Sequence, residues 1–174
     1  ILMLPDEGDA LMPGLPGSSE KKDLDSFRTI FTDERFKPDM IKIYPTLIVK
    51  GTKLYDLWSE GRYTPLSTEQ ASQLIATIKK DVPEWVRIQR IQRDIPAQEI
   101  CAGIKKSNLR QYVEAEMQKH HTTCRCIRCR EIGHVPSEKT KNVTESSLRF
   151  VCRQYRASGG DEFFISLEDS TQEI

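Results

Sequence analysis

Three cysteines lie within six residues of one another, at Cys124, Cys126 and Cys129. Thiolates in this C-x-C-x-x-C spacing can converge on one metal ion at about 2.3 Å from each sulfur, and a tetrahedral structural zinc then needs one more ligand. His134 follows Cys129 by five residues and is narrowly favoured over Cys152 as that ligand. The alternatives are three free thiols in a loop, which would oxidise readily, and an iron-sulfur cluster, which normally has four thiolate ligands.

Basic residues are in excess around the cysteines. Residues 84–130 contain ten basic and five acidic side chains, whereas residues 157–174 contain five acids and no Lys or Arg. Because the net charge of the chain is +0, this asymmetry indicates a local polyanion-binding face rather than a uniformly basic protein. The alternative is a solvated surface on which basic side chains pair with Glu114 and Glu116. The candidates for contact with nucleic acid are Lys105, Lys106, Arg110, Arg125, Arg128 and Arg130.

A second polar group lies near the C-terminal ends of two expected strands. Lys42 and Tyr44 belong to one strand, and Arg93 and Asp94 follow the other. In parallel α/β architectures, ligands bind at this edge of the sheet. An Arg-Asp pair here could equally be scaffolding. The chain has no Ser-His-Asp order, no P-loop and no glycine-rich dinucleotide fingerprint.

Hydrophobic periodicity and turn signals predict the elements that position these residues. Helices are expected over residues 22–36, 54–58, 68–80 and 109–120, the third with a capping box from Ser67 to Gln70. Strands are expected over residues 40–44 and 85–91, and a hairpin over residues 148–167. Within residues 1–25, the stretch 12–19 is too rich in Pro and Gly for a helix and is expected to form a loop. The order strand, helix, strand indicates a parallel α/β unit.

Length and composition limit the class of protein. With 174 residues, 37% hydrophobic and 30% charged, the chain can form one domain or two small modules, and it is too short for a complete eight-unit β/α barrel. No apolar run approaches the roughly 20 residues of a membrane helix, so no membrane association is expected. Clustered cysteines favour a reducing compartment, and a cytoplasmic location is expected.

Several segments taken together carry a family resemblance. They are residues 12–18, 41–58, 61–63, 91–96, 108–110, 124–134 and 157–169. In unbroken order they resemble the catalytic subunit of Elongator, a family of radical SAM enzymes fused to a GNAT-type acetyltransferase, which modify the wobble uridine of tRNA. The cysteine pattern is similar to that of archaeal or bacterial members. Residues 1–11 depart from the family pattern, which has a strand before Met-Pro-Gly.

The resemblance implies an α/β fold in three parts. Residues 1–100 would form the C-terminal part of a radical SAM β/α barrel, residues 101–147 a helix and a zinc-binding linker, and residues 148–174 an antiparallel β-hairpin leading toward an acetyltransferase domain. The basic residues around the zinc loop would then contribute to the tRNA surface. The residues implied at the substrate cavity are Lys42, Tyr44, Gln92, Arg93 and Asp94.

The resemblance also implies a function for the parent protein. The parent would transfer an acetyl-derived carboxymethyl group to wobble uridine, using a 4Fe-4S cluster, S-adenosylmethionine and acetyl-CoA. This chain lacks the three cluster cysteines that precede the matching region in the family, so it is expected to be inactive alone. Zinc is the cofactor expected in the chain itself. Expected partners are tRNA and either a second copy or other Elongator subunits. The alternative is a stand-alone, zinc-stabilised interaction module without catalysis.

Overall fold

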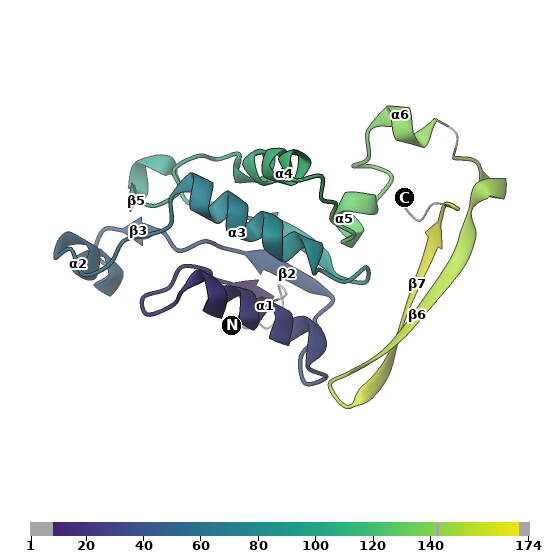
Figure 1. Cartoon of the computed structure of the whole chain (residues 1–174), viewed down its shortest axis with the longest axis horizontal. Coiled ribbons are helices and arrows are strands. Elements are labelled where there is room, and N and C mark those ends of the chain that lie inside the picture. Colours follow the sequence, from purple (N-terminus) through teal and green to yellow (C-terminus); the bar gives the residue numbers. More distant parts are fainter. Residues whose placement is uncertain (1–8, 142, 171–174) are drawn as a thin grey trace.

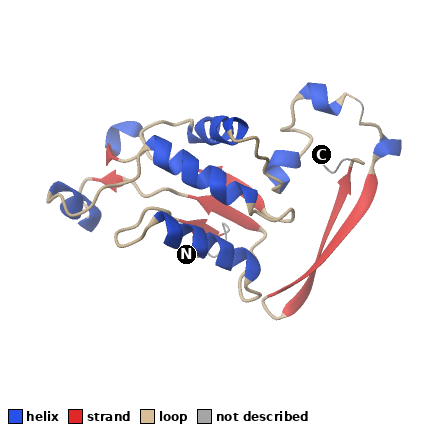
Figure 2. Cartoon of the chain, viewed as in Figure 1, coloured by secondary structure: helices blue, strands red, loops and turns tan. Residues whose placement is uncertain are grey.

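The computed structural model describes residues 9–141 and 143–170 of the chain (Figure 1). An α/β body contains the sheet and the longer helices, and a β-hairpin extends along one side of it (Figure 2). The expectations for residues 1–8 lie outside the described residues. No described helix is long and apolar enough to cross a membrane.

The body is built on a three-stranded parallel sheet. Its strands are β1 (Asp9–Leu11), β2 (Met40–Ile43) and β4 (Arg87–Ile91), in the order β1-β2-β4. β2 ends before Pro45, as expected for a residue that cannot donate to the ladder. The parallel pairing of β2 with β4 confirms the α/β unit.

Strand β1 lies directly before the Met-Pro-Gly motif at residues 12–14, so the expected departure of residues 1–11 from the family pattern is wrong at Asp9–Leu11. Asp9–Leu11 pairs with β2 residue by residue from Ile41 to Ile43. A segment of three residues is too short to show the alternation that predicts a strand. It forms a strand because it pairs with the edge of β2. Helix α1 (Glu20–Thr32) then begins at the N-cap Ser19, whose side chain accepts a hydrogen bond from the backbone N–H of Lys22.

Helices α1, α3 (Thr68–Lys80) and α4 (Leu109–Lys119) pack with the sheet in one hydrophobic core. The core combines the apolar stripe of each helix with the isoleucines of β2 and β4, so α4 shares a core with the strands that precede it. Its central members are Phe27, Ile30, Ile41, Ile43, Leu74, Ile75, Ile78, Ile88, Leu109, Val113 and Met117. Burial of this apolar area is the main stabilising term for the body.

The N-terminus of α3 has the expected capping box. Ser67 Oγ accepts from the backbone N–H of Gln70 at 3.1 Å, and Gln70 Oε1 accepts from the backbone N–H of Ser67 at 2.9 Å. Two backbone donors at the helix start are therefore satisfied by side chains.

Replacing Ser67 with alanine is expected to lower the free energy of unfolding by about 1 kcal/mol, because one of these donors loses its acceptor. Urea unfolding followed by circular dichroism measures the change. Ser59→Ala is the matched control, since Ser59 is exposed and caps no helix start. Equal destabilisation by both substitutions would contradict the capping role.

Short elements connect the core segments. Strands β3 (Ile48–Val49) and β5 (Ile100–Ala102) form a small antiparallel pair. The remaining elements are α2 (Lys53–Ser59), the 3-10 helix η1 (Ala97–Glu99), α5 (Ile127–Arg130), α6 (Ser137–Thr140) and the 3-10 helix η2 (Glu145–Ser147).

The hairpin consists of β6 (Arg149–Ala157) and β7 (Gly160–Glu168). Its turn places Ser158 and Gly159 at φ values of 49° and 82°, as a two-residue hairpin turn of type I′ requires. The tip contacts the body because Ser158 N donates to the carbonyl oxygen of Glu34 at 2.6 Å. Farther along, Tyr155 stacks on Trp85 with ring centroids 4.3 Å apart.

Candidate metal centre and nucleic-acid interface

The three clustered cysteines come together in space. The sulfur atoms of Cys124, Cys126 and Cys129 all lie within 4.8 Å of one another. The segment leaves α4, turns at Cys126 and enters α5, where the backbone N–H of Cys129 donates to the carbonyl of Cys126 at 3.0 Å. Ile127 N also donates to the carbonyl of Val86 at 2.9 Å, so the loop is fixed to the segment that enters β4. Three soft thiol ligands on a tight, anchored turn fit a zinc ion.

The thiols also interact electrostatically with one another. Hydrogen bonds from Cys124 and Cys129 lower the pKa of Cys126 well below that of an ordinary thiol. Hydrogen bonds to Cys126 and Cys129, together with burial, raise the pKa of Cys124. Negative charge therefore resides first on Cys126, which is fully buried. In this arrangement the two neighbouring thiols donate hydrogen bonds to one thiolate. A bound cation would replace the protons of those thiols.

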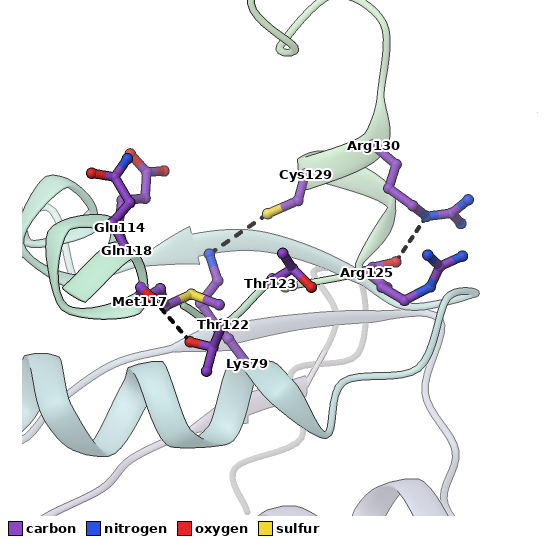
Figure 3. Close-up of a pocket in the computed structure, with 10 residues that line it drawn as sticks. Lys79, Glu114, Met117, Gln118, Thr122, Thr123, Arg125, Cys129 and Arg130 are labelled. Carbon is purple, nitrogen blue, oxygen red and sulfur yellow. Dashed lines mark hydrogen bonds between the residues drawn. The ribbon is translucent and has the colours of Figure 1, made fainter. Parts of the chain in front are cut away.

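Lys79 extends from α3 to this cluster (Figure 3). Its side chain is 1% exposed, and its Nζ donates to Cys129 Sγ at 3.6 Å. The motifs of the sequence did not point to Lys79. Its position in the sequence could have indicated burial, because Lys79 lies one helical turn after Ile75 on the apolar side of the helix.

A cavity of about 270 Å³ adjoins the cluster. Cys124, Cys129 and Lys79 line it together with α4 residues such as Met117 and Glu114 (Figure 3). Among the described residues, the metal-binding group contains the three cysteines and no fourth His, Cys, Asp or Glu. The fourth ligand expected from the sequence is not part of that group.

Both sequence candidates for the fourth ligand lie on other segments. His134 is exposed, and its Nδ1 lies 2.9 Å from Glu131 Oε2. That same oxygen accepts from Arg87 at 2.8 Å, so His134 contacts a surface carboxylate that also pairs with Arg87. Cys152 is exposed on β6. The identity of the fourth ligand therefore stays a prediction.

Two of the six basic candidates are engaged within the protein. Arg125 forms an ion pair with Glu84. Arg130 is 7% exposed, and its Nη1 lies 2.9 Å from Glu168 Oε1. Arg125 lies between two of the clustered cysteines, and its carboxylate partner comes from the segment before β4.

Of the other four candidates, two lysines are exposed and two arginines are partly exposed. Lys105 and Lys106 are exposed between β5 and α4. Arg128 is partly exposed on α5. Arg110 is partly exposed on α4; burial, and secondarily the positive charge of Arg128, lowers its pKa. These four side chains are the accessible part of the expected polyanion face.

Glu84, Arg153 and Glu168 were not singled out by the sequence. Arg153 pairs with Glu84 and donates to Glu168 Oε1 at 2.6 Å and Oε2 at 2.9 Å. Since Arg130 and Arg125 pair with the same two glutamates, one network joins the cysteine loop, the start of β4 and both hairpin strands. No sequence motif signals it, because its members are spread over residues 84–168.

The strand-end candidates divide into two places. Gln92, Arg93 and Asp94 line a cavity of about 330 Å³ at the C-terminal end of β4, where Arg110 also contributes. Gln92 has a φ of 101°, and its side-chain oxygen is buried without a hydrogen-bond partner among the described residues. Such a strained residue with an unmatched acceptor is typical of a ligand-binding position.

Lys42 and Tyr44 lie beside this cavity rather than in its lining. Lys42 is buried in β2, with 7% of its surface exposed. The guanidinium of Arg93 lies 5.8 Å from the ring centre of Tyr44, which connects the two strand ends. Asp94 pairs with Arg90 at the surface, so the pair formed here is not a buried one.

Comparison with known proteins identifies homologues of the chain. Residues 38–119 match the radical SAM C-terminal domain. The chain is 48% identical over 164 residues to tRNA uridine(34) acetyltransferase of Methanocaldococcus jannaschii and 40% identical over 164 residues to Elongator complex protein 3 of Saccharomyces cerevisiae. The chain is a homologue of these proteins. Each match covers 94% of the chain, which spans 30% and 29% of the respective relatives.

The fold of this Elongator homologue agrees with a solved structure. The archaeal Methanocaldococcus infernus Elp3 with an N-terminal deletion superimposes with a TM-score of 0.89 and 48% sequence identity, covering 95% of this chain and 39% of that one. The Dehalococcoides mccartyi tRNA uridine(34) acetyltransferase is 50% identical over 163 residues, 94% of this chain and 35% of the relative. The expected α/β fold, with a radical SAM C-terminal domain followed by the cysteine-bearing segment and the hairpin, is confirmed.

Proposed function

We propose that this chain acts as part of a tRNA-modifying acyltransferase. The observation that carries the proposal is the 48% identity to a tRNA uridine(34) acetyltransferase over 94% of the chain. In the parent, a 4Fe-4S cluster and S-adenosylmethionine would supply radical chemistry and acetyl-CoA the transferred group. The chain contributes a wall of the substrate cavity, part of the tRNA surface and a zinc site. A cytoplasmic location is proposed because clustered cysteines favour a reducing compartment.

The wall of the substrate cavity is assigned to the strand ends. Gln92, Arg93 and Asp94 line the cavity after β4, and Lys42 and Tyr44 lie at the end of the neighbouring strand. Ligands of parallel α/β proteins bind at this edge. The cationic group of Arg93 and the unmatched acceptor of Gln92 suit a polar, anionic substrate such as a nucleotide.

The zinc site is assigned to Cys124, Cys126 and Cys129, with His134 or Cys152 as the proposed fourth ligand. Its role would be structural. A metal held by these thiols would fix the turn between α4 and α5. It would also hold Arg125, which pairs with Glu84 before β4, and Arg130, which pairs with Glu168 in the hairpin.

The tRNA surface is assigned to the six basic candidates, with the exposed Lys105 and Lys106 as its most accessible members. Arg110 and Arg128 extend it along α4 and α5. Arg125 and Arg130 support it from within through their pairs with Glu84 and Glu168. Such a surface would contact phosphates without reading bases.

Changing both Lys105 and Lys106 to alanine is expected to weaken tRNA binding and to reduce its dependence on salt. Removal of one lysine–phosphate interaction should lower the slope of log K against log salt concentration by about 0.7 to 0.9, so the slope of the double variant should fall by roughly 1.5. Fluorescence anisotropy with labelled tRNA at several salt concentrations measures both quantities.

The matched control for this experiment is the double variant Lys21→Ala, Lys22→Ala. These two lysines are exposed on α1, a helix that contains none of the six basic candidates. An unchanged slope in the Lys105, Lys106 variant, or an equal loss in the control, would count against the proposed tRNA surface.

A second candidate function is a zinc-stabilised interaction module. One observation favours it: on the outer face of the hairpin, 83% of the surface of Phe150 and 65% of the surface of Ile165 are exposed to solvent. These residues share one face, since Phe150 pairs with Leu167 and Cys152 with Ile165. A second copy or another Elongator subunit is the proposed occupant. Salt-independent association measured by light scattering, without tRNA binding, would favour this function.

A further inference from the structure

We propose that Lys79 is the charge partner of the metal site and sets its affinity for the ion. Its buried ammonium would balance the negative charge that three thiolates leave on a divalent cation. The inference rests on the proposed zinc site, which it deepens by adding a residue from a helix that carries no ligand. The observation behind it is the contact between Lys79 on α3 and Cys129 on α5.

The first step of the argument is the burial of Lys79. A lysine with 1% of its surface exposed loses the hydration of its charge, which is costly unless an anion or hydrogen-bond acceptor replaces the water. Among the described residues, the partner shown for Nζ is Cys129 Sγ at 3.6 Å. Glu114 lines the same cavity but forms no ion pair with Lys79 in the described part of the chain. The cysteine cluster is therefore the anion available to this lysine.

The second step is the charge of the occupied site. Three thiolates exceed the charge of a divalent ion by one, and a net negative charge beside a hydrophobic core is unfavourable. Cys126 is fully buried and belongs to the core cluster. One ammonium at hydrogen-bond distance from a thiolate ligand brings the local net charge to zero, provided that the fourth ligand is neutral. Of the two proposed fourth ligands, a neutral His134 meets this condition, and Cys152 meets it only as a protonated thiol.

The third step concerns the sulfur itself. A positive N–H donor near a thiolate stabilises its lone-pair electrons, so it changes the electronic properties of the metal-sulfur bond as well as the affinity. A lysine that only filled space would do neither. Affinity and the energy of the thiolate-to-metal charge-transfer band are therefore two independent measures of the role.

The test compares Lys79→Met with the native chain. Competition with a chromophoric chelator gives the zinc affinity, and substitution with cobalt(II) gives the charge-transfer band. We expect Lys79→Met to bind zinc about 10- to 100-fold more weakly, and the cobalt band to move to longer wavelength, because the thiolate electrons are no longer stabilised. Lys80→Met is the matched control, since Lys80 is the exposed neighbour on the same helix.

The outcomes separate this inference from the zinc proposal. If the native chain and Lys79→Met bind zinc with equal affinity, the proposed role of Lys79 is wrong and the proposed zinc site still stands. No metal bound by the folded native chain overturns both. If Lys79→Met does not fold, Lys79→Gln replaces it, because glutamine keeps an N–H donor without the charge. Native affinity in Lys79→Gln would likewise overturn the proposal.

Discussion

Serine at Cys124, Cys126 and Cys129 together is expected to abolish the binding of one zinc ion per chain and to lower the stability of the chain markedly. Serine hydroxyls are poor zinc ligands, so the three atoms that converge in the structure would no longer hold the ion. Structural zinc sites contribute about 10 kcal/mol or more of apparent binding free energy at neutral pH, part of which appears as folding free energy. Elemental mass spectrometry and thermal unfolding measure the two effects.

Single variants refine this experiment. Cys101→Ser is the matched control, because Cys101 lies on β5, outside the metal-binding group. His134→Ala and Cys152→Ser test the two proposals for the fourth ligand separately, and the true ligand should show the larger loss of zinc. Zinc retained in the triple variant, iron in place of zinc, or no metal in a well-folded native chain would each remove the zinc assignment.

Replacing Glu168 with alanine is expected to destabilise the chain by about 3 to 5 kcal/mol, because it leaves the buried Arg130 without its counter-charge and Arg153 with Glu84 as its remaining partner. The Glu168 side chain accepts from Arg153 at 2.6 and 2.9 Å and from Ser166 at 2.6 Å, and it lies 2.9 Å from Arg130. Urea unfolding measures the loss. Near-ultraviolet circular dichroism reports whether the stacking of Tyr155 on Trp85 is lost with it.

The control for Glu168→Ala is Glu162→Ala, an exposed position on the same strand that should change stability by less than about 0.5 kcal/mol. The pH dependence gives a second check. Burial opposes ionisation of Glu168, but hydrogen bonds from Arg153, Ser166 and Arg130 outweigh it and lower its pKa to about 2. The stabilisation is then complete above the usual pKa of 4.5 and is lost as pH falls toward 2. Equal acid sensitivity in Glu168→Ala would contradict this assignment.

Local features of the chain were determined by the sequence. The capping box at Ser67 and Gln70, the two-residue turn at Ser158 and Gly159, and the end of β2 before Pro45 all depend on residues a few positions apart. The cysteine spacing belongs to this class, because a turn of six residues is enough to bring the sulfurs together. The family resemblance was equally readable, since it rests on the order of short motifs.

Tertiary structure alone decided the remainder. Strand β1 exists because the edge of β2 orders it, and Lys79 reaches Cys129 across 50 positions of sequence. Arg125 pairs with Glu84, 41 positions away. Periodicity and motifs depend on residues that are close in the sequence. The partner of a buried charge depends on which residues lie near it in the folded structure. The convergence of the three cysteines was therefore predictable from the sequence, and the charges that surround them were set by the fold.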